Sequence, residues 1–285
     1  MISVEYGITT GGEQQAVTNE DGSIELPGGG TITTQNGTTI DVPPGTSISS
    51  DGIISFANDG GGTIKNNYGH KYNIPADAEI ILDAISPLGY YVSLKNPFSD
   101  INEGDWHYDY VMFVYARGLM NGTWAEPMMF SPDMTATRGM VVTILYRMAG
   151  SPEADAGLQA TGGGFIDVSA GAWYADAVKW AAANGIVSGY GDGRFGPEDD
   201  ITREDFTVIL YNYAAISDID IREIREYTEF NDDAEISYYA REAIIKSYKA
   251  AVLNGKPGNM FAPKDYITRA EAATILKSFI EAIVR

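Results

Sequence analysis

Residues 267–273, Ile267-Thr268-Arg269-Ala270-Glu271-Ala272-Ala273, decide how the second half of this chain folds. A threonine followed three residues later by glutamate is a capping box. The hydroxyl accepts a hydrogen bond from the third N–H of the helix, and the carboxylate accepts one from the threonine N–H. The apolar run that follows predicts an amphipathic helix beginning at Arg269. Thr268 and Glu271 are therefore predicted to be structural caps.

Two further copies of this pattern lie upstream. Ile201-Thr202-Arg203-Glu204-Asp205 keeps an acid three residues after its threonine, whereas Ala136-Thr137-Arg138-Gly139-Met140 has methionine there. We expect Thr202 and Thr137 to cap helices as well, the latter through its hydroxyl alone.

Other landmarks repeat in the same order before each Thr-Arg pair. They are a Phe-x-Asp triplet, an aromatic residue eight positions after its phenylalanine, a glycine that ends a turn, and a Phe-x-Pro triplet. From the leading phenylalanine to the threonine the separations are 39, 37 and 38 residues. Units of this length predict helix–loop–helix elements that bury their apolar faces against one another. The repeated residues are Phe98, Phe165, Phe230; Asp100, Asp167, Asp232; Trp106, Trp173, Tyr238; Gly122, Gly189, Gly255; and Phe130, Phe195, Phe261.

Composition changes near residues 93–97. The first 95 residues contain no arginine or tryptophan, and short alternating runs such as Thr39-Ile40-Asp41-Val42 are separated by turns such as Asn36-Gly37. This pattern predicts short antiparallel strands. We therefore predict a mainly α fold preceded by a small β-rich segment. The boundaries are 1–95 for a β-rich stalk or spacer, then 96–150, 163–217 and 228–285 for the first, second and third repeats.

An apolar residue before proline recurs in the β-rich segment, at Leu26-Pro27, Val42-Pro43 and Ile74-Pro75. The spacing is compatible with stacked hairpins or solenoid rungs. It is equally compatible with prolines that simply end edge strands.

Composition also excludes several classes of function. The net charge is −20 with no basic cluster, so nucleic acid is not an expected partner. No apolar run is long enough to span a membrane. The chain has no cysteine and two histidines, so we expect neither a metal site, a cofactor nor catalysis. The start of the chain lacks the pattern of a secretory signal, which suggests either a cytosolic protein or a piece of a longer one.

The three arginines pose a question, since each is expected at the first position of a helix. A cation there is mildly unfavourable, by about 0.3–1 kcal/mol. One explanation is an ion pair with Asp100, Asp167 or Asp232. The other is an anion site, in which free N–H groups and a guanidinium bind a carboxylate or phosphate.

The threefold pattern resembles that of the S-layer homology family, over roughly residues 96–285. The resemblance implies a pseudo-threefold trimer of repeats around a central three-helix bundle. It further implies grooves between neighbouring repeats that bind secondary cell-wall polysaccharide, often through a ketal-linked pyruvate. The carboxylate of that pyruvate would meet the motif arginines, here Arg138, Arg203 and Arg269.

The remaining repeated residues are candidate ligand contacts with structural alternatives. Trp106, Trp173 and Tyr238 either staple the preceding loop to the core or provide a platform for a sugar ring. The glycines Gly122, Gly189 and Gly255 allow a ligand close to the backbone, or serve as helix C-caps. The acids Asp100, Asp167 and Asp232 complete the candidate site.

From these residues we expect a non-enzymatic module, exported and attached to the cell surface. Its partner would be a pyruvylated secondary cell-wall polysaccharide, and the chain would be a monomer with internal pseudo-threefold symmetry. Two alternatives to this expectation stay open. In the first, the chain is the anchoring end of a larger cell-surface glycoside hydrolase. In the second, it is part of a protein that forms a surface lattice.

Overall fold

The computed structural model describes residues 6–11, 14–57, 61–66, 68–83, 86, 88–152 and 164–283. The chain forms two compact units, which divide between Phe130 and Ser131. The first contains the β-rich segment and the first half of repeat one. The second contains the rest of repeat one and the other two repeats. No described helix is long and apolar enough to cross a membrane.

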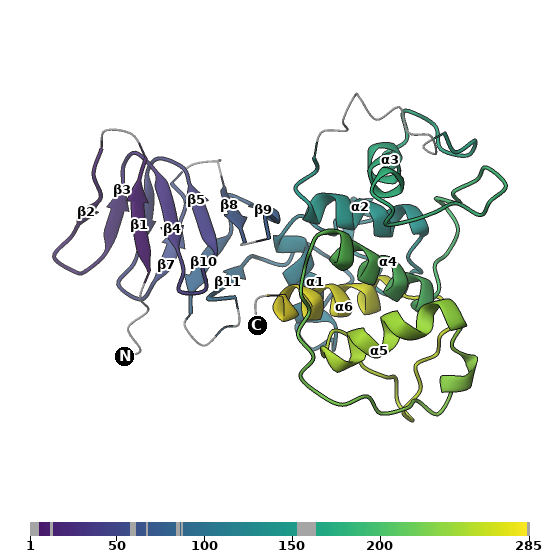
Figure 1. The fold of residues 1–285 in the computed structure, drawn as a ribbon. Helices are drawn as coiled ribbons and strands as arrows, with labels where there is room; N and C mark the ends of the chain where they lie inside the picture. Colours follow the sequence, from purple (N-terminus) through teal and green to yellow (C-terminus); the bar gives the residue numbers. More distant parts are fainter. Residues whose placement is uncertain are drawn as a thin grey trace. The chain divides into compact units, whose positions relative to one another are not determined.

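Eleven short strands of the first unit form two antiparallel sheets (Figure 1). The five-stranded sheet has the order β1-β4-β5-β8-β9, and the six-stranded sheet has the order β11-β10-β7-β6-β3-β2. Along the chain, hairpins such as β4–β5 and β6–β7 alternate between the two sheets. The strands are β1 (Gly7–Thr10), β2 (Val17–Thr18), β3 (Ile24–Leu26), β4 (Gly30–Thr33), β5 (Thr39–Val42), β6 (Thr46–Ile48), β7 (Ile53–Ser55), β8 (Gly62–Lys65), β9 (Lys71–Ile74), β10 (Glu79–Leu82) and β11 (Tyr90–Ser93).

Alternation of isoleucine with polar residues builds these sheets. Ile32, Ile40 and Ile64 of the five-stranded sheet are fully buried, as are Ile48 and Ile54 of the other. Pro27, Pro43 and Pro75 each follow the last residue of a strand, namely β3, β5 and β9, and of these only β9 lies at a sheet edge. Hairpins that alternate between two sheets therefore account for the proline spacing better than edge strands do.

The prediction of a mainly α fold is wrong. Helices account for 28% and strands for 20% of the described residues. The two sheets occupy the first 95 residues, and a small third sheet pairs β12 (Trp124–Ala125) with β13 (Met128–Met129) in the first repeat. Strands of three or four residues carry few apolar side chains each, but the two sheets together bury a core in which isoleucine is prominent.

The first unit also contains α1 (Tyr108–Ala116), which contacts β11. The guanidinium of Arg117, just after α1, lies 3.5 Å from the ring centre of Phe113 and 5.3 Å from that of Tyr90 on β11. The contact with Tyr90 joins the β-rich segment to the first repeat.

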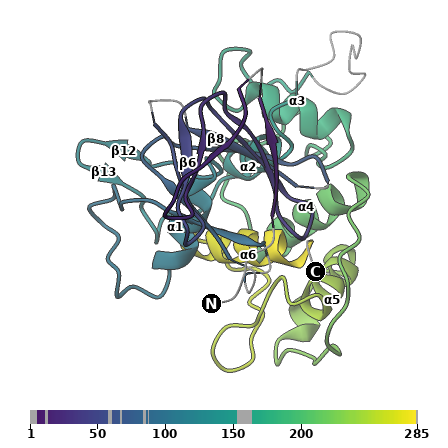
Figure 2. The same ribbon diagram turned by 90° about the vertical axis from the view of Figure 1, so that its left-hand side faces the viewer.

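Helices dominate the second unit. Helix α3 packs against α2, and α5 packs against α4. Helices α4 and α6 lie side by side in both views (Figures 1 and 2), and the rings of Tyr213 and Phe279 are 6.3 Å apart between them. The helices are α2 (Arg138–Met148), α3 (Ala175–Ala183), α4 (Arg203–Ile216), α5 (Arg241–Lys249) and α6 (Arg269–Ala282), with short 3-10 turns η1 (Asp233–Glu235) and η2 (Tyr238–Ala240).

A closed ring of three backbone hydrogen bonds joins the repeats just before α2, α4 and α6. The N–H of Ala136 donates to the carbonyl of Ile267 (2.9 Å), that of Ile267 to Ile201 (3.0 Å), and that of Ile201 back to Ala136 (3.0 Å). All three residues are buried. The ring places the backbones of the three Thr-Arg motifs in equivalent positions, although their side chains meet different neighbours.

Candidate functional site

The motif threonines sit at the N-caps of α2, α4 and α6. Each hydroxyl accepts a hydrogen bond from the N–H three residues later, at 3.3 Å for Thr137 and 3.2 Å for Thr202 and Thr268. Only Thr268 has a full capping box, because the carboxylate of Glu271 reaches its N–H at 3.1 Å. The shorter side chain of Asp205 instead accepts a bond from the Thr202 hydroxyl at 2.8 Å.

The first N–H groups of these helices are not free. The N–H of Arg138, Arg203 and Arg269 donates to the carbonyl of Asp199, Asp265 and Met134, respectively, in a neighbouring repeat. The next N–H of each helix also donates to a carbonyl, that of a proline in the same neighbouring loop. These donors were part of the predicted anion site, and here they hold the repeats together instead. Any anion site must therefore rely on side chains.

The Phe-x-Asp acids bind backbone rather than arginine. Asp167 accepts hydrogen bonds from the N–H of Phe195 and of Gly196, both at 2.8 Å. Asp232 does the same for Phe261 and the next residue, and Asp100 accepts from Phe130 at 2.8 Å. Burial acts to raise the pKa of Asp167, but the two N–H groups outweigh it, so that this pKa lies below its ordinary value.

Arg203 is a buried clamp between the second and third repeats. It is 4% exposed, and its Nε donates to the carbonyl of Phe261 at 2.9 Å. Its guanidinium lies 3.6 Å from the carboxylate of Glu271, which also meets Lys256 at 3.1 Å. Burial lowers the pKa of Arg203, although Glu271 opposes this effect. This arginine is enclosed by the protein's own groups.

Arg269 occupies the equivalent place with different neighbours. It is 5% exposed, and one of its terminal nitrogens lies 3.9 Å from the sulphur of Met140. Met140 takes the position that Glu271 has beside Arg203. The missing acid of the first repeat thus affects the surroundings of Arg269 and not those of Arg138.

Arg138 is the accessible member of the three. It is half-buried, and it donates to the carbonyl of Phe195 at 2.9 Å and of Ser188 at 3.1 Å. Its guanidinium lies 5.0 Å from the ring centre of Tyr190. Within the described parts of the chain, no carboxylate lies within ion-pair distance of it.

Asp205 explains why Arg138 has no acidic partner. It corresponds to Glu271 in the repeat pattern but is one methylene shorter. Its two carboxylate oxygens accept hydrogen bonds from Thr202 at 2.8 Å and from Tyr239 at 2.7 Å. The acid that would neutralise Arg138 is therefore held by other groups.

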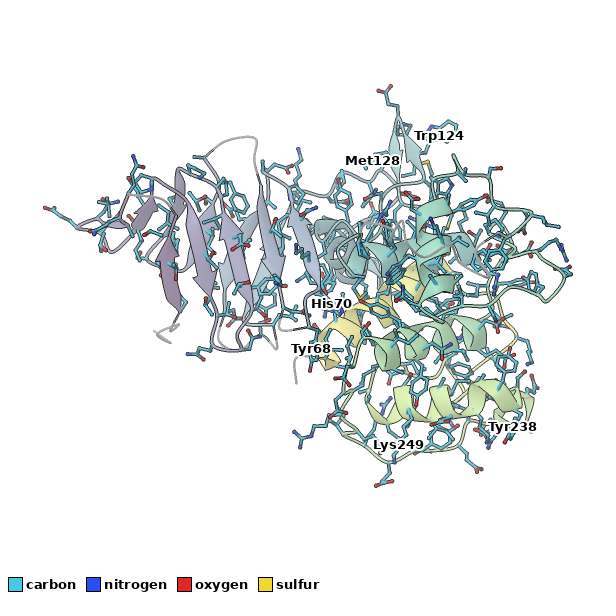
Figure 3. All side chains as sticks on the ribbon, turned by 45° about the horizontal axis from the view of Figure 1, so that its top comes forward. Tyr68, His70, Trp124, Met128, Tyr238 and Lys249 are labelled. Carbon is cyan, nitrogen blue, oxygen red and sulfur yellow. The ribbon has the colours of Figure 1, made fainter. Side chains whose placement is uncertain are left out.

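The three repeat aromatics are exposed, at 64% for Trp106, 58% for Trp173 and 96% for Tyr238. Trp173 packs edge-on against Tyr174, with ring centres 5.0 Å apart, and Trp106 packs in the same way against His107. Figure 3 shows Tyr238 at the surface beside the start of α5. Such exposure leaves ring faces open to solvent, as a sugar platform requires.

Each repeat glycine packs closely against residues of its own repeat. A Cβ at Gly189 would lie 2.5 Å from the ring of Phe165, and one at Gly255 would lie 2.9 Å from Phe230. At Gly122 it would meet the carbonyl of Met129 at 2.9 Å. The left-handed residues after α1 and α3 are Gly118 and Gly185, so the repeat glycines are required for close packing rather than as C-caps.

Sequence reasoning did not single out Tyr190, Glu204, Ser237 or Lys264. Tyr190 follows the repeat glycine Gly189, and Glu204 stands inside the Thr-Arg motif itself. Aligning the repeats position by position marks Glu204, because Gly139 and Ala270 occupy its place in the other repeats. In the described residues, no group of three or more His, Asp or Glu side chains could hold a metal ion.

Comparison with known proteins identifies the three repeats. The S-layer homology domain pattern matches residues 97–139, 164–207 and 229–273. An exoglucanase, XynX, of Acetivibrio thermocellus is 34% identical over 65% of this chain and 16% of its own length. A cellulosome-anchoring protein of A. thermocellus is 26% identical over 54% of the chain and 34% of its own length.

A surface-layer 125 kDa protein of Lysinibacillus sphaericus is 26% identical over 77% of the chain and 18% of its own length. The chain therefore spans only a minor part of these relatives. Those with enzyme names match through the repeats, which are anchoring and not catalytic modules. The chain thus carries three S-layer homology domains in tandem.

Proposed function

We propose that this module holds its protein to a secondary cell-wall polysaccharide by binding a carboxylate of that polymer, such as a ketal-linked pyruvate, at Arg138. The proposal rests on the burial and the bonding partners of this guanidinium. It is half-buried, it bonds only to backbone carbonyls, and no described acid neutralises it. In a chain with a net charge of −20, an arginine left without an acid suits an anionic ligand.

Aromatic side chains around Arg138 support a sugar as the carrier of that carboxylate. Tyr190 is 50% exposed, and its hydroxyl donates to Asp199 at 3.0 Å, which fixes the ring beside the guanidinium. Across the motif, a Cβ at Gly139 would lie 3.2 Å from the ring of Tyr174, against which the exposed Trp173 packs. A pyranose ring could stack on the exposed ring of Tyr190 or Trp173 while its carboxylate meets Arg138.

Calorimetric titration with purified wall polysaccharide, with and without its pyruvyl groups, tests this function. We expect binding that is lost when the pyruvate is removed. Equal binding of both polymers would move recognition from Arg138 to the aromatics. Absence of binding to either would contradict the proposal.

We further propose that the anchored protein is longer than this chain and that the chain itself is not an enzyme. Its exoglucanase relative matches over 16% of that protein's length, so the bulk of such a protein lies outside the repeats. In this arrangement the repeats hold a polysaccharide-degrading domain at the wall, and the chain acts as a monomer. Assaying this chain alone on glucan substrates should give no hydrolysis, and light scattering should give a monomer mass.

A further inference from the structure

Between the second and third repeats, donors from Ser237, Lys264 and Tyr239 converge on one buried carboxylate. Glu204, the second residue of α4, is 3% exposed. It accepts hydrogen bonds from the N–H of Ser237 at 3.0 Å and from the hydroxyl of Ser237 at 2.9 Å, and the ammonium of Lys264 also contacts it. Lys264 is held in turn by the Ser237 hydroxyl at 2.6 Å. Burial acts to raise the pKa of Glu204, but these partners outweigh it and hold the pKa below its ordinary value.

The equivalent positions of the other repeats carry no such acid. Gly139 follows Arg138 in α2, and Ala270 follows Arg269 in α6. Glu204 is thus the one long side chain that fills the space next to a motif arginine. A backbone N–H, a hydroxyl and an ammonium around two carboxylate oxygens form a complete receptor for any carboxylate.

This receptor is open to solvent at Lys264, and Tyr239 links it to a nearby hollow. The side chain of Lys264 is 52% exposed, so solvent reaches the receptor there. The hydroxyl of Tyr239 lies 3.2 Å from Glu204, and Tyr239 also lines an open hollow of about 460 Å³ together with Tyr238 and the first turns of α5. A sugar could therefore occupy the hollow while a carboxylate on it reached toward the position of Glu204.

We propose that this interface is a second carboxylate-binding site, which the chain occupies with its own Glu204. The side chain acts as an internal substitute for the ligand carboxylate, so the wild-type module binds its polymer at Arg138 and not here. Removal of the Glu204 side chain opens the site to an acidic sugar. The choice of acidic sugar as ligand rests on the function proposed above, whereas the receptor itself rests on the contacts of Glu204.

The test uses Glu204→Gly and Glu204→Ala, which copy the residues found in the first and third repeats. Each is made in wild type and in Arg138→Ala, where the first site is removed. Glu226→Ala, an exposed acid, serves as the control for the loss of one negative charge. The probe is the methyl glycoside of a 4,6-pyruvylated hexose, titrated by calorimetry beside the same glycoside without pyruvate.

In the Arg138→Ala background we expect Glu204→Gly to bind the pyruvylated probe about tenfold or more tightly than Arg138→Ala alone does. The gain should be absent from Glu226→Ala and should disappear when Lys264→Ala is added. In the wild-type background the number of binding sites should rise from one to two.

A folded Glu204→Gly or Glu204→Ala that binds no better than its parent would overturn the proposal. So would loss of the fold in both variants, since Glu204 would then be a structural clamp rather than an internal ligand. The function proposed above is judged separately, by whether Arg138→Ala alone weakens binding of the probe to the otherwise unchanged chain.

Discussion

The arginine of the Thr-Arg motif has a different role at each of the two interfaces of the second repeat. Between the second and third repeats, Arg203 is 4% exposed and lies 3.6 Å from Glu271. Between the first and second, Arg138 is half-buried and has no acidic partner among the described residues. The acid facing it, Asp205, is one methylene shorter than Glu271 and bonds to Tyr239 instead.

This difference shows that one motif residue can be a clamp or a ligand contact, depending on its neighbours. Both arginines hold the next repeat through a phenylalanine carbonyl at 2.9 Å. What separates them is the acid on the following helix and the residue after the arginine, Gly139 or Glu204. Threefold repetition therefore does not make three equal sites.

The largest expected effect comes from breaking the clamp. Arg203→Ala leaves the carbonyl of Phe261 and the carboxylate of Glu271 without this partner in a buried interface. We expect a loss of about 3 kcal/mol, a shift in melting temperature of roughly 6–12 °C for a chain of this size. Thermal unfolding by circular dichroism measures it. An unchanged melting temperature would show that Arg203 is not a clamp.

Arg138→Ala should instead affect binding. It removes two hydrogen bonds at a half-exposed position, so the loss of stability should be about 1 kcal/mol. Binding of the pyruvylated polymer should weaken by about tenfold or more, because a charge-assisted contact is lost. Arg203→Ala is not a suitable control, since it is expected to destabilise the adjoining interface. Glu226→Ala should leave both affinity and stability unchanged, and a drop in stability without loss of affinity for Arg138→Ala would refute the assignment.

Asp205→Glu should make the interface between the first and second repeats resemble that between the second and third. The longer side chain should reach Arg138 as Glu271 reaches Arg203, and neutralise it. A partly exposed pair of this kind contributes about 0.2–1 kcal/mol, so affinity for the polymer should fall by a factor of about 1.4 to 5. Asp205→Asn, which adds no reach, is the matched control in the same titration. Stronger binding by Asp205→Glu would argue against competition for the guanidinium.

The smallest effect concerns pH. The folded-state pKa of Asp167 is below its ordinary value, so its contribution to stability is present above the pKa of the unfolded chain and is lost as pH falls through the folded pKa. Urea unfolding between pH 5 and pH 3 should therefore show a steeper acid loss for the wild type than for Asp167→Asn. Parallel curves would mean that the two N–H bonds of Asp167 contribute nothing to the pH dependence.

Landmark spacing was sufficient to find the repeats, and the capping residues Thr268 and Glu271 lie where their pattern predicts. The extent of the apolar core in the β-rich segment could not be predicted from the sequence. Residues such as Ile32 and Ile40 are separated by threonine and aspartate, and they form one core only when the two sheets stack. The roles of the three arginines could not be separated from sequence. Their difference depends on whether a side chain on the next helix reaches across the interface, a matter of one methylene.

The central claim is that Arg138, and neither Arg203 nor Arg269, meets the carboxylate of the ligand. The most direct measurement is an NMR titration that follows the Nε–H signals of the three arginines as a pyruvylated methyl hexoside is added. We predict a large shift for Arg138, almost none for Arg203 and Arg269, and none for any of them with the glycoside that lacks pyruvate. Shifts at Arg203 or Arg269 while Arg138 stays unchanged would contradict the account.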